Sequence, residues 1–287
     1  MKKLFLVDGT YELFRAFFGA PEHASPDGLE VGAVQGVLRS MIRLWREEQP
    51  THIAVATDHV IESFRNDLFE YYKSGEGLDP ILHNQFAPLE EGLAALGFYV
   101  FAMVEFEADD ALAAAAHQFA DQFDQVILAS PDKDLMQCVN DKTLVWDRRR
   151  EKYYDAEAVK EKMGVAPASI ADYLALVGDS ADGIPGLSGW GAKSTATLLS
   201  EYNHIEQIPA DFEKWNVKVR GGAKLCTTLQ NEMKEALLYR KLATLRVDVP
   251  MPPLADLEFF GTNKSKWQAF CKKYGFERLL EAPLAWL

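Results

Sequence analysis

Acidic residues stand after several apolar runs of this sequence, in places where they could hold divalent cations. Asp8 follows LFLV, Asp58 follows IAVAT, and Asp132 and Asp134 come after VILASP. Carboxylate oxygens are preferred ligands of hard ions such as Mg²⁺ and Mn²⁺. Two such ions about 4 Å apart can activate a water and stabilise the leaving oxygen of a phosphoryl transfer. We therefore expect metal-dependent hydrolysis of a phosphate ester.

Further acids occur at the ends of predicted helices. EADD places Glu107, Asp109 and Asp110 at a helix start, where the helix dipole favours negative charge, and GDSAD places Asp179 and Asp182 where an apolar helix stops. Gathered carboxylates repel one another and are costly to desolvate, so we expect bound cations to stabilise them. Chance remains an alternative, because the chain has 43 acidic residues and acids are common at strand ends and helix caps.

The first half of the chain alternates between strand-like and helical patterns. This alternation predicts an α/β domain with a mostly parallel central sheet flanked by helices, in which ligands bind at the carboxyl ends of the strands. Asp8, Asp58, Asp132 and Asp134 follow such strand-like runs, and Glu107 opens the helix after the third run. The strand-like runs are Leu4–Val7, Ile53–Ala56, Tyr99–Ala102 and Val126–Ala129, and the helical patterns include Gly32–Glu47 and Asp109–Phe119.

From about Tyr153 onward the sequence reads as helices joined by Gly/Pro-rich turns, including Ala171–Val177, Lys193–Glu201 and Lys224–Thr244. We therefore predict an α/β core over residues 1–170 and a helical half over residues 171–287. Within the core, residues 60–84 form a long aromatic and charged excursion, and such excursions are usually functional or disordered.

Composition leaves the partner open but restricts the compartment. The net charge of −13 argues against a protein that grips nucleic acid mainly through a basic surface, unless bound cations reverse the local field. The cysteines Cys138, Cys226 and Cys271 lie far apart, which disfavours a disulfide framework and a thiolate zinc site. The start MKKLFLVDG is too short an apolar stretch for a signal peptide or membrane span. We expect a cytoplasmic protein with no membrane partner.

The order of the motifs resembles the bacterial and phage 5′-nuclease family, the flap-endonuclease relatives that also form the N-terminal domain of many family-A DNA polymerases. The matching segments span nearly the whole chain: LFLVDGTYELFRAFF, SPDGLEVGAVQGVL, SFRNDLFEYYKSG, FEADDALA, SPDKDLMQ, LVGDSADGIPGLSGWGAKSTATLL and YRKLATLRVDVP. The resemblance implies a PIN-like core, a helical arch at about 60–84 and a helix-three-turn-helix DNA grip at about 171–200. It also implies a monomeric 5′-3′ exonuclease or flap endonuclease that cuts DNA near a 5′ flap, overhang or frayed end.

The resemblance assigns roles to individual positions. A first Mg²⁺ or Mn²⁺ would be surrounded by Asp8, Asp58, Glu107, Asp109, Asp110 and Asp132, and a second would be held by Asp134, Asp179 and Asp182, with Asp132 as a candidate bridge. Arg65, Tyr72 and Lys73 match arch residues that steer the scissile phosphate. The hairpin glycines Gly186, Gly189 and Gly191, with the charge of Lys193, would contact the DNA backbone, and family members often hold a potassium ion in this hairpin. Apart from the resemblance, the basic residues of the helical half form a patch that could bind duplex phosphates, namely Lys214, Lys218, Arg220 and Lys224.

Each of these assignments has a structural alternative. The hairpin could be a plain interhelical turn, or a Walker-type nucleotide loop, which Ala192 between Gly191 and Lys193 disfavours. The arch residues and the basic residues could be solvated helix faces. The sequence also departs from the family pattern: Glu76 stands where arginine is expected, Val31 where threonine is usual, and Ala181 and Gly183 flank Asp182 where Ser/Gly and Asn are common.

Other functions compete with the nuclease. A magnesium phosphotransferase with an aspartyl nucleophile would need a second aspartate at position 10, where Thr10 stands. A ribonuclease of the same core is disfavoured by the DNA-grip hairpin. A DNA-junction binder of the same fold with weakened catalysis stays open because of Glu76 and Gly183. The sequence leaves open whether the chain acts alone or belongs to a polymerase.

Overall fold

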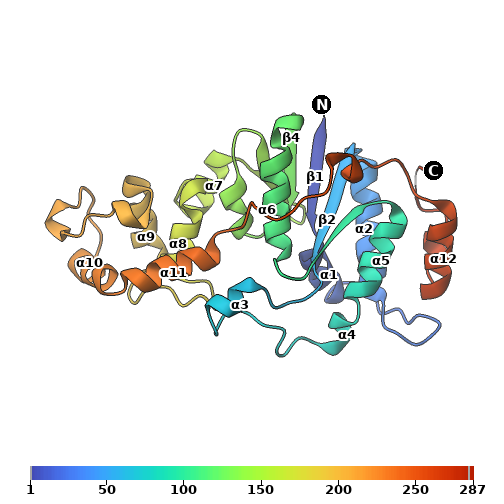
Figure 1. The fold of residues 1–287 in the computed structure, drawn as a ribbon, viewed down its shortest axis with the longest axis horizontal. Helices are drawn as coiled ribbons and strands as arrows, with labels where there is room; N and C mark the ends of the chain where they lie inside the picture. Colours follow the sequence, from blue (N-terminus) through green and yellow to red (C-terminus); the bar gives the residue numbers. More distant parts are fainter. Residues whose placement is uncertain (1, 284) are drawn as a thin grey trace. The chain divides into compact units, whose positions relative to one another are not determined.

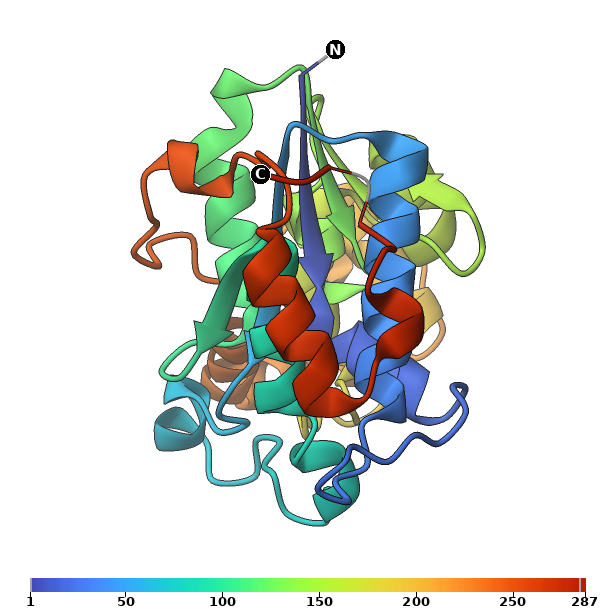
Figure 2. The same cartoon turned by 90° about the vertical axis from the view of Figure 1, so that its right-hand side faces the viewer.

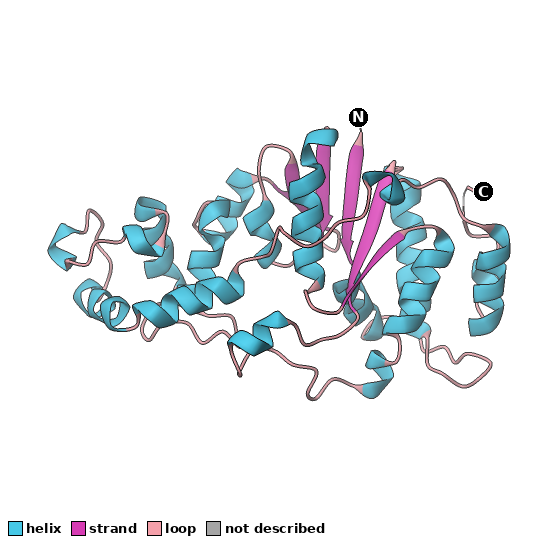
Figure 3. Ribbon diagram, in the orientation of Figure 1, coloured by secondary structure: helices cyan, strands magenta, loops and turns pink. Residues whose placement is uncertain are grey.

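A computed structural model describes residues 2–283 and 285–287 of the chain. Contacts divide it into two compact units, one made of Met1–Ile61, Gly75–Ser130 and Val247–Leu287, the other of Glu62–Ser74 and Pro131–Arg246. Figure 1 traces the chain through both units, and Figure 3 shows the distribution of helices and strands. Within the described residues, none of the helices has the length and apolar character needed to cross a membrane. The predicted division at residue 170 stays a prediction.

The first unit contains a parallel sheet in the order β3-β2-β1-β4. Its central strand is buried on both faces, because the side chains of the run Leu4–Val7 are 0% exposed. Continuous apolar runs are typical of parallel strands covered by helices on both sides. The mostly parallel α/β sheet predicted from the sequence is therefore confirmed. The strands are β1 (Lys3–Asp8), β2 (His52–Asp58), β3 (Tyr99–Met103) and β4 (Gln125–Ala129).

Helices cover both faces of these strands, with α6 and α2 on opposite sides of β1 in Figure 2. In α2, apolar residues recur three and four positions apart, so that one face is buried. The predicted helices Gly32–Glu47 and Asp109–Phe119 are confirmed as α2 and α6. The helices of this unit are α1 (Gly9–Phe17), α2 (Gly32–Glu48), α4 (Pro80–His83), α5 (Phe86–Leu96), α6 (Ala108–Phe119) and α12 (Lys264–Tyr274), with short 3₁₀ turns η1 (Ala120–Gln122), η6 (Leu254–Leu257) and η7 (Glu277–Leu279).

The second unit is mainly helical and adds one antiparallel strand pair. Its helices are α3 (Phe64–Leu68), α7 (Ala156–Met163), α8 (Ile170–Val177), α9 (Ala192–Tyr202), α10 (Gly222–Asn231) and α11 (Met233–Ala243). The strands are β5 (Thr143–Asp147) and β6 (Lys152–Tyr154), and the 3₁₀ turns are η2 (Asp134–Cys138), η3 (Pro167–Ser169), η4 (Ile205–Gln207) and η5 (Phe212–Lys214).

The predicted single helix Lys224–Thr244 is wrong. Glu232, with φ −114° and ψ 25°, leaves the helical region and separates α10 from α11. The apolar spacing continues across this break, which is why the sequence pattern did not reveal it.

A glycine-rich connection joins α8 to α9 in the manner of the predicted helix-three-turn-helix. The connection folds back on the end of α8, where the Leu187 N–H donates to the Leu176 carbonyl oxygen at 2.9 Å. Gly186 has φ +71°, and a Cβ there would lie 2.5 Å from the Gly178 nitrogen. Both the left-handed backbone and the close approach require glycine at this position.

Candidate metal centre

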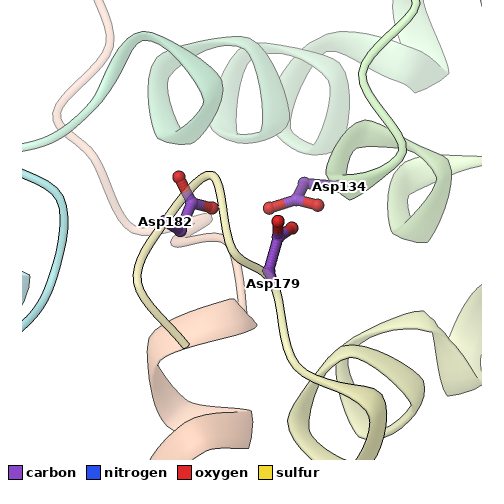
Figure 4. Close-up of side chains that lie close together, drawn as sticks. All are labelled: Asp134, Asp179 and Asp182. Carbon is purple, nitrogen blue, oxygen red and sulfur yellow. The ribbon is translucent and has the colours of Figure 1, made fainter. Parts of the chain in front are cut away.

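Three carboxylates of the second unit converge in the structure. Ligand oxygens of Asp134, Asp179 and Asp182 all lie within 4.8 Å of one another. Figure 4 shows the side chains of Asp134 and Asp179 directed toward each other, with Asp182 beside them on the same turn as Asp179. The structure thus brings together the acids that the family resemblance assigned to the second metal.

Local hydrogen bonds set the two turns that carry these acids. Asp179 and Ile184 exchange backbone hydrogen bonds of 2.8 Å just beyond α8, and the Asp179 carboxylate accepts from the Ala181 N–H at 3.1 Å. On the other turn, the Asp132 carboxylate accepts from the Asp134 N–H at 2.9 Å. Aspartate side chains commonly stabilise turns through such bonds to their own backbone. These turns orient the cluster before any ligand is present.

The environment of Asp134 is unfavourable for an isolated carboxylate. Its side chain is buried, and its Oδ1 atom has no hydrogen-bond partner within the described part of the chain. Burial, followed by the charges of Asp132, Asp182 and Asp179, raises the pKa of Asp134 well above its ordinary value. A buried carboxylate with this much repulsion calls for a cation.

Two lysines already place positive charge on the cluster. Lys133 Nζ lies 2.6 Å from an oxygen of Asp179, and Lys73 Nζ lies 3.2 Å from an oxygen of Asp182. Burial opposes the charge of Lys133, but the hydrogen bond and charge of Asp179 outweigh it and raise the pKa of Lys133. The sequence reasoning overlooked Lys133, although its place between Asp132 and Asp134 was a usable signal.

The donor set of this cluster fits a hard divalent cation. All of its candidate ligand atoms are carboxylate oxygens, which suit Mg²⁺ or Mn²⁺ better than zinc. The unpartnered Oδ1 of Asp134 supplies a buried acceptor that a cation would satisfy. The ammonium groups of Lys73 and Lys133 pair with Asp182 and Asp179, which shows that positive charge is favourable next to this cluster.

The acids of the first unit lie at the carboxyl ends of β1 and β2, as predicted. Asp8 ends β1 and caps α1, accepting from the Tyr11 N–H and from the Ser130 hydroxyl, both at 2.8 Å. Asp58 ends β2 and accepts from the Ala108 N–H at 2.7 Å. The Asp58 bond holds the end of β2 against the first turn of α6, whereas the Asp8 bonds join the end of β1 to α1 and to Ser130.

That first turn of α6 carries the EADD acids. Glu107 precedes the helix as its N-cap, and the Asp110 carboxylate accepts from the Glu107 N–H at 3.0 Å. Glu107 and Asp110 are buried and Asp109 is half-buried. The capping bonds fit the structural alternative for these acids, and their role as first-metal ligands stays a prediction. So does the bridging role of Asp132, whose side chain is exposed.

The arch residues are not a solvated helix face. Arg65 is buried and donates from Nε to the Leu242 carbonyl oxygen at 2.7 Å and from Nη2 to the Thr244 carbonyl oxygen at 3.1 Å. Tyr72 is also buried, whereas Lys73 is half-buried and reaches Asp182. The solvated-face alternative is therefore wrong for Arg65 and Tyr72, and Lys73 is the arch residue in contact with the acidic cluster.

The predicted DNA-grip residues lie around the α8–α9 connection and in the following helices. Gly186 and Gly189 have positive φ angles, whereas Gly191, with φ −124°, caps α9 in an ordinary conformation. Trp190 is buried within the connection. The lysine at the start of α9 and the basic residues beyond it are exposed, namely Lys193, Lys214, Lys218, Arg220 and Lys224.

Comparison with known proteins gives two family matches. Residues 3–164 match the model described as 5′-3′ exonuclease, N-terminal resolvase-like domain, and residues 165–265 match 5′-3′ exonuclease, C-terminal SAM fold. A 5′-3′ exonuclease of Bacillus subtilis is 31% identical over 291 residues, covering 97% of this chain and 96% of that protein.

Other relatives are much longer. DNA polymerase I of Bacillus subtilis is 34% identical over 286 residues, covering 98% of this chain, and the chain spans only 32% of its length. The fold also resembles a solved structure of bacteriophage T5 flap endonuclease in a pseudo-enzyme-product complex with DNA and metal ions. That similarity has a TM-score of 0.69 at 20% identity and covers 85% of this chain and 89% of the phage protein.

Proposed function

The chain belongs to the 5′-3′ exonuclease family, and we propose that it is a structure-dependent 5′-3′ exonuclease and flap endonuclease. Its substrate would be DNA with a 5′ flap, overhang or frayed 5′ end. Its reaction would be hydrolysis of phosphodiesters near the single-strand/duplex junction, with two Mg²⁺ or Mn²⁺ ions. The DNA and metal ions in the phage flap endonuclease complex support this proposal by analogy of fold.

The observation that carries the proposal is the convergence of Asp134, Asp179 and Asp182 around an unsatisfied buried carboxylate oxygen. A protein without a metal would gain nothing from this repulsion, since burial and neighbouring charges already oppose ionisation of Asp134. Divalent cations bound there would supply an activated water and stabilise the leaving oxygen. Asp134, Asp179 and Asp182 would hold one ion, and the other ion would be held by Asp8, Asp58, Glu107, Asp109, Asp110 and Asp132.

The remaining site residues would position the substrate. Lys73 Nζ lies at the edge of the cluster, so its ammonium group can meet a phosphate that approaches Asp182. Arg65 would act by anchoring the arch segment to the end of α11, through its bonds to the carbonyl oxygens of Leu242 and Thr244. Tyr72 packs in the same segment.

The α8–α9 connection would hold the duplex. Its turn at the exposed Gly189 presents backbone to the surface, Gly186 shapes the turn from a half-buried position, and Lys193 at the start of α9 adds a positive charge. Contacts of this kind position DNA without reading its sequence. A potassium ion at this connection and phosphate contacts of Lys218, Arg220 and Lys224 belong to the same proposal, and a comparison of DNA binding in potassium and in lithium salts tests the ion.

A 5′-labelled flap duplex tests the whole proposal. With Mg²⁺ or Mn²⁺ we expect release of short labelled fragments, and with EDTA we expect the flap to stay intact. A flap that stays intact in metal but binds tightly would favour the alternative of a catalytically weakened junction binder, which Glu76 and Gly183 suggest. Absence of both cleavage and binding would reject a junction-specific function.

A further inference from the structure

Tyr71 is a large exposed aromatic side chain beside the arch lysine. Its side chain is 73% exposed, whereas the adjacent Tyr72 is buried. Single exposed aromatic residues are common on protein surfaces and need no functional explanation by themselves. The surroundings of Tyr71 are unusual because both its backbone and its ring are held in place next to the acidic cluster.

The backbone of residues 71–73 is seated on the acidic turn. The Lys73 N–H donates to the Asp182 carbonyl oxygen at 3.1 Å, in addition to the ion pair between the Lys73 and Asp182 side chains. A Cβ at Gly183 would lie 2.2 Å from the Tyr71 carbonyl oxygen, so this approach is possible only with glycine. Gly183 therefore allows residues 71–73 of the arch segment to lie directly against the turn that carries Asp182.

The ring of Tyr71 is braced by other aromatic rings. It meets Phe69 edge to face, with centroids 5.6 Å apart, and Phe69 meets Tyr239 of α11 edge to face at 5.8 Å. Such pairs stabilise a particular ring orientation. A braced ring loses little conformational entropy when a ligand packs on its exposed face.

We propose that Tyr71 is a stacking platform for a nucleobase next to the scissile phosphate, an inference that rests on the nuclease function proposed above. A phosphate at the Asp182 edge of the cluster would have its neighbouring bases within reach of residues attached to the same turn. An unpaired base exposes an apolar face that an aromatic ring can cover, and this stacking tolerates every base. Tyr71 is thus a positioning residue that holds an unpaired nucleotide while Lys73 meets the phosphate.

Site-specific fluorescence tests this role. A 5′-flap duplex carries 2-aminopurine at a single position on one or the other side of the junction. Its fluorescence is measured with the chain in Ca²⁺, and gels check that the flap is not cleaved. With the wild-type chain we expect quenching at one of these positions, since an aromatic ring stacked on the probe quenches it. Tyr71→Ala should abolish the quenching and weaken binding roughly tenfold. Tyr71→Phe should keep both, because the ring and not the hydroxyl is used.

Phe260 provides the matched control. It is exposed to a similar degree, 66%, and belongs to the other compact unit, so Phe260→Ala should leave quenching and affinity unchanged. Unchanged quenching in Tyr71→Ala would overturn the stacking role, as would equal losses of quenching and affinity in Tyr71→Phe and Tyr71→Ala. If the wild-type chain still cleaved the flap, the proposed nuclease function would be unaffected by that result. A wild-type chain that neither binds nor cuts the flap would overturn both.

Discussion

Asp179 belongs to the acidic cluster and pairs with Lys133. Replacing it by asparagine removes its charge with little change in the shape of the side chain. Asp179→Asn keeps an oxygen to accept from the Ala181 N–H but loses a metal ligand and the partner of the Lys133 ammonium. We expect flap cleavage to fall by roughly 100-fold or more, as in losses of transition-state electrostatics, with little loss of folding. Single-turnover rates and circular dichroism melting provide the measurement. Unchanged cleavage would remove Asp179 from the site.

Substitutions of Lys73 and Arg65 should have different effects, because we propose that Lys73 positions the substrate and that Arg65 stabilises the fold. Lys73→Ala removes a half-buried ammonium from Asp182 and should slow cleavage strongly while the melting temperature changes little. Arg65→Ala leaves the carbonyl oxygens of Leu242 and Thr244 without their donor in a buried place and should destabilise the fold by about 2 kcal/mol. Urea unfolding and cleavage rates of both variants decide this. An Arg65→Ala variant of normal stability but abolished cleavage would instead assign Arg65 to the chemistry.

The residue scale also shows where prediction from sequence stops. The acids Asp134, Asp179 and Asp182 were identified because their order along the chain and the turns around them are local features. The partners of Arg65 were not, because Leu242 lies 177 positions away and only the tertiary fold brings it close. From the sequence alone, a charged residue such as Arg65 is expected to face solvent. Only the structure reveals the distant carbonyl oxygens that accept its hydrogen bonds.

At the scale of elements, an ionic network joins α8, η4 and α11 in the second unit. Arg240 of α11 donates to the buried carboxylate of Asp172 at 3.0 Å and to both oxygens of Glu206, each at 2.5 Å. Asp172 also accepts from the Ile205 N–H at 3.2 Å and meets His204 Nδ1 at 2.9 Å. Arg240 thereby ties three elements around one buried charge.

Loss of this arginine should destabilise the second unit. Arg240→Met leaves Asp172 buried without its cation, and removal of one partner of a buried pair costs about 3 kcal/mol. The hydrogen bond from Arg240 lowers the pKa of Glu206, so Glu206 stabilises the fold above the ordinary carboxyl range and loses this effect as the pH falls. The stability difference between wild type and Arg240→Met should therefore narrow as the pH falls from about 5 to about 3.

Urea unfolding across that pH range is the measurement, with Glu206→Gln as the control. Glu206→Gln leaves Arg240 on Asp172 and removes only the exposed partner, so it should cost less at neutral pH than Arg240→Met. It should also remove part of the acid dependence. A stability difference that widens on acidification would contradict the role of Glu206.

Elements were predicted well where burial dominates and poorly where the backbone turns without a sequence signal. The run Leu4–Val7 is wholly apolar because β1 is covered on both faces, and it was identified directly. The break at Glu232 was missed because a glutamate is an ordinary helix residue and its departure from helical angles depends on packing. The short strand pair β5–β6 was missed as well, since three residues of β6 are too few for a periodic pattern.

At the scale of the whole molecule, the net charge of −13 sets a problem for a protein that acts on DNA. A polyanion is repelled by an acidic chain unless positive charge is concentrated where it binds. The exposed basic residues beyond α9 supply some of this charge, and divalent cations at Asp134, Asp179 and Asp182 would supply the rest at the place where the phosphate is cut. Metal and substrate should therefore bind cooperatively.

This cooperativity can be measured as the ratio of flap-DNA affinities in Ca²⁺ and in EDTA. We expect the wild-type chain to bind at least about tenfold more tightly in Ca²⁺, because bound cations remove a local repulsion. The combined change of Asp134, Asp179 and Asp182 to asparagine should lose much of this dependence on Ca²⁺ and keep only the part due to the ion proposed at the other acids. It should also bind more tightly in EDTA than the wild type does. The matched control replaces the exposed acids Glu157, Glu161 and Glu213 of the same unit by glutamine, which changes the net charge equally. It should keep the wild-type dependence on Ca²⁺. If the control lost that dependence to the same extent as the cluster variant, total charge and not the cluster would govern DNA binding.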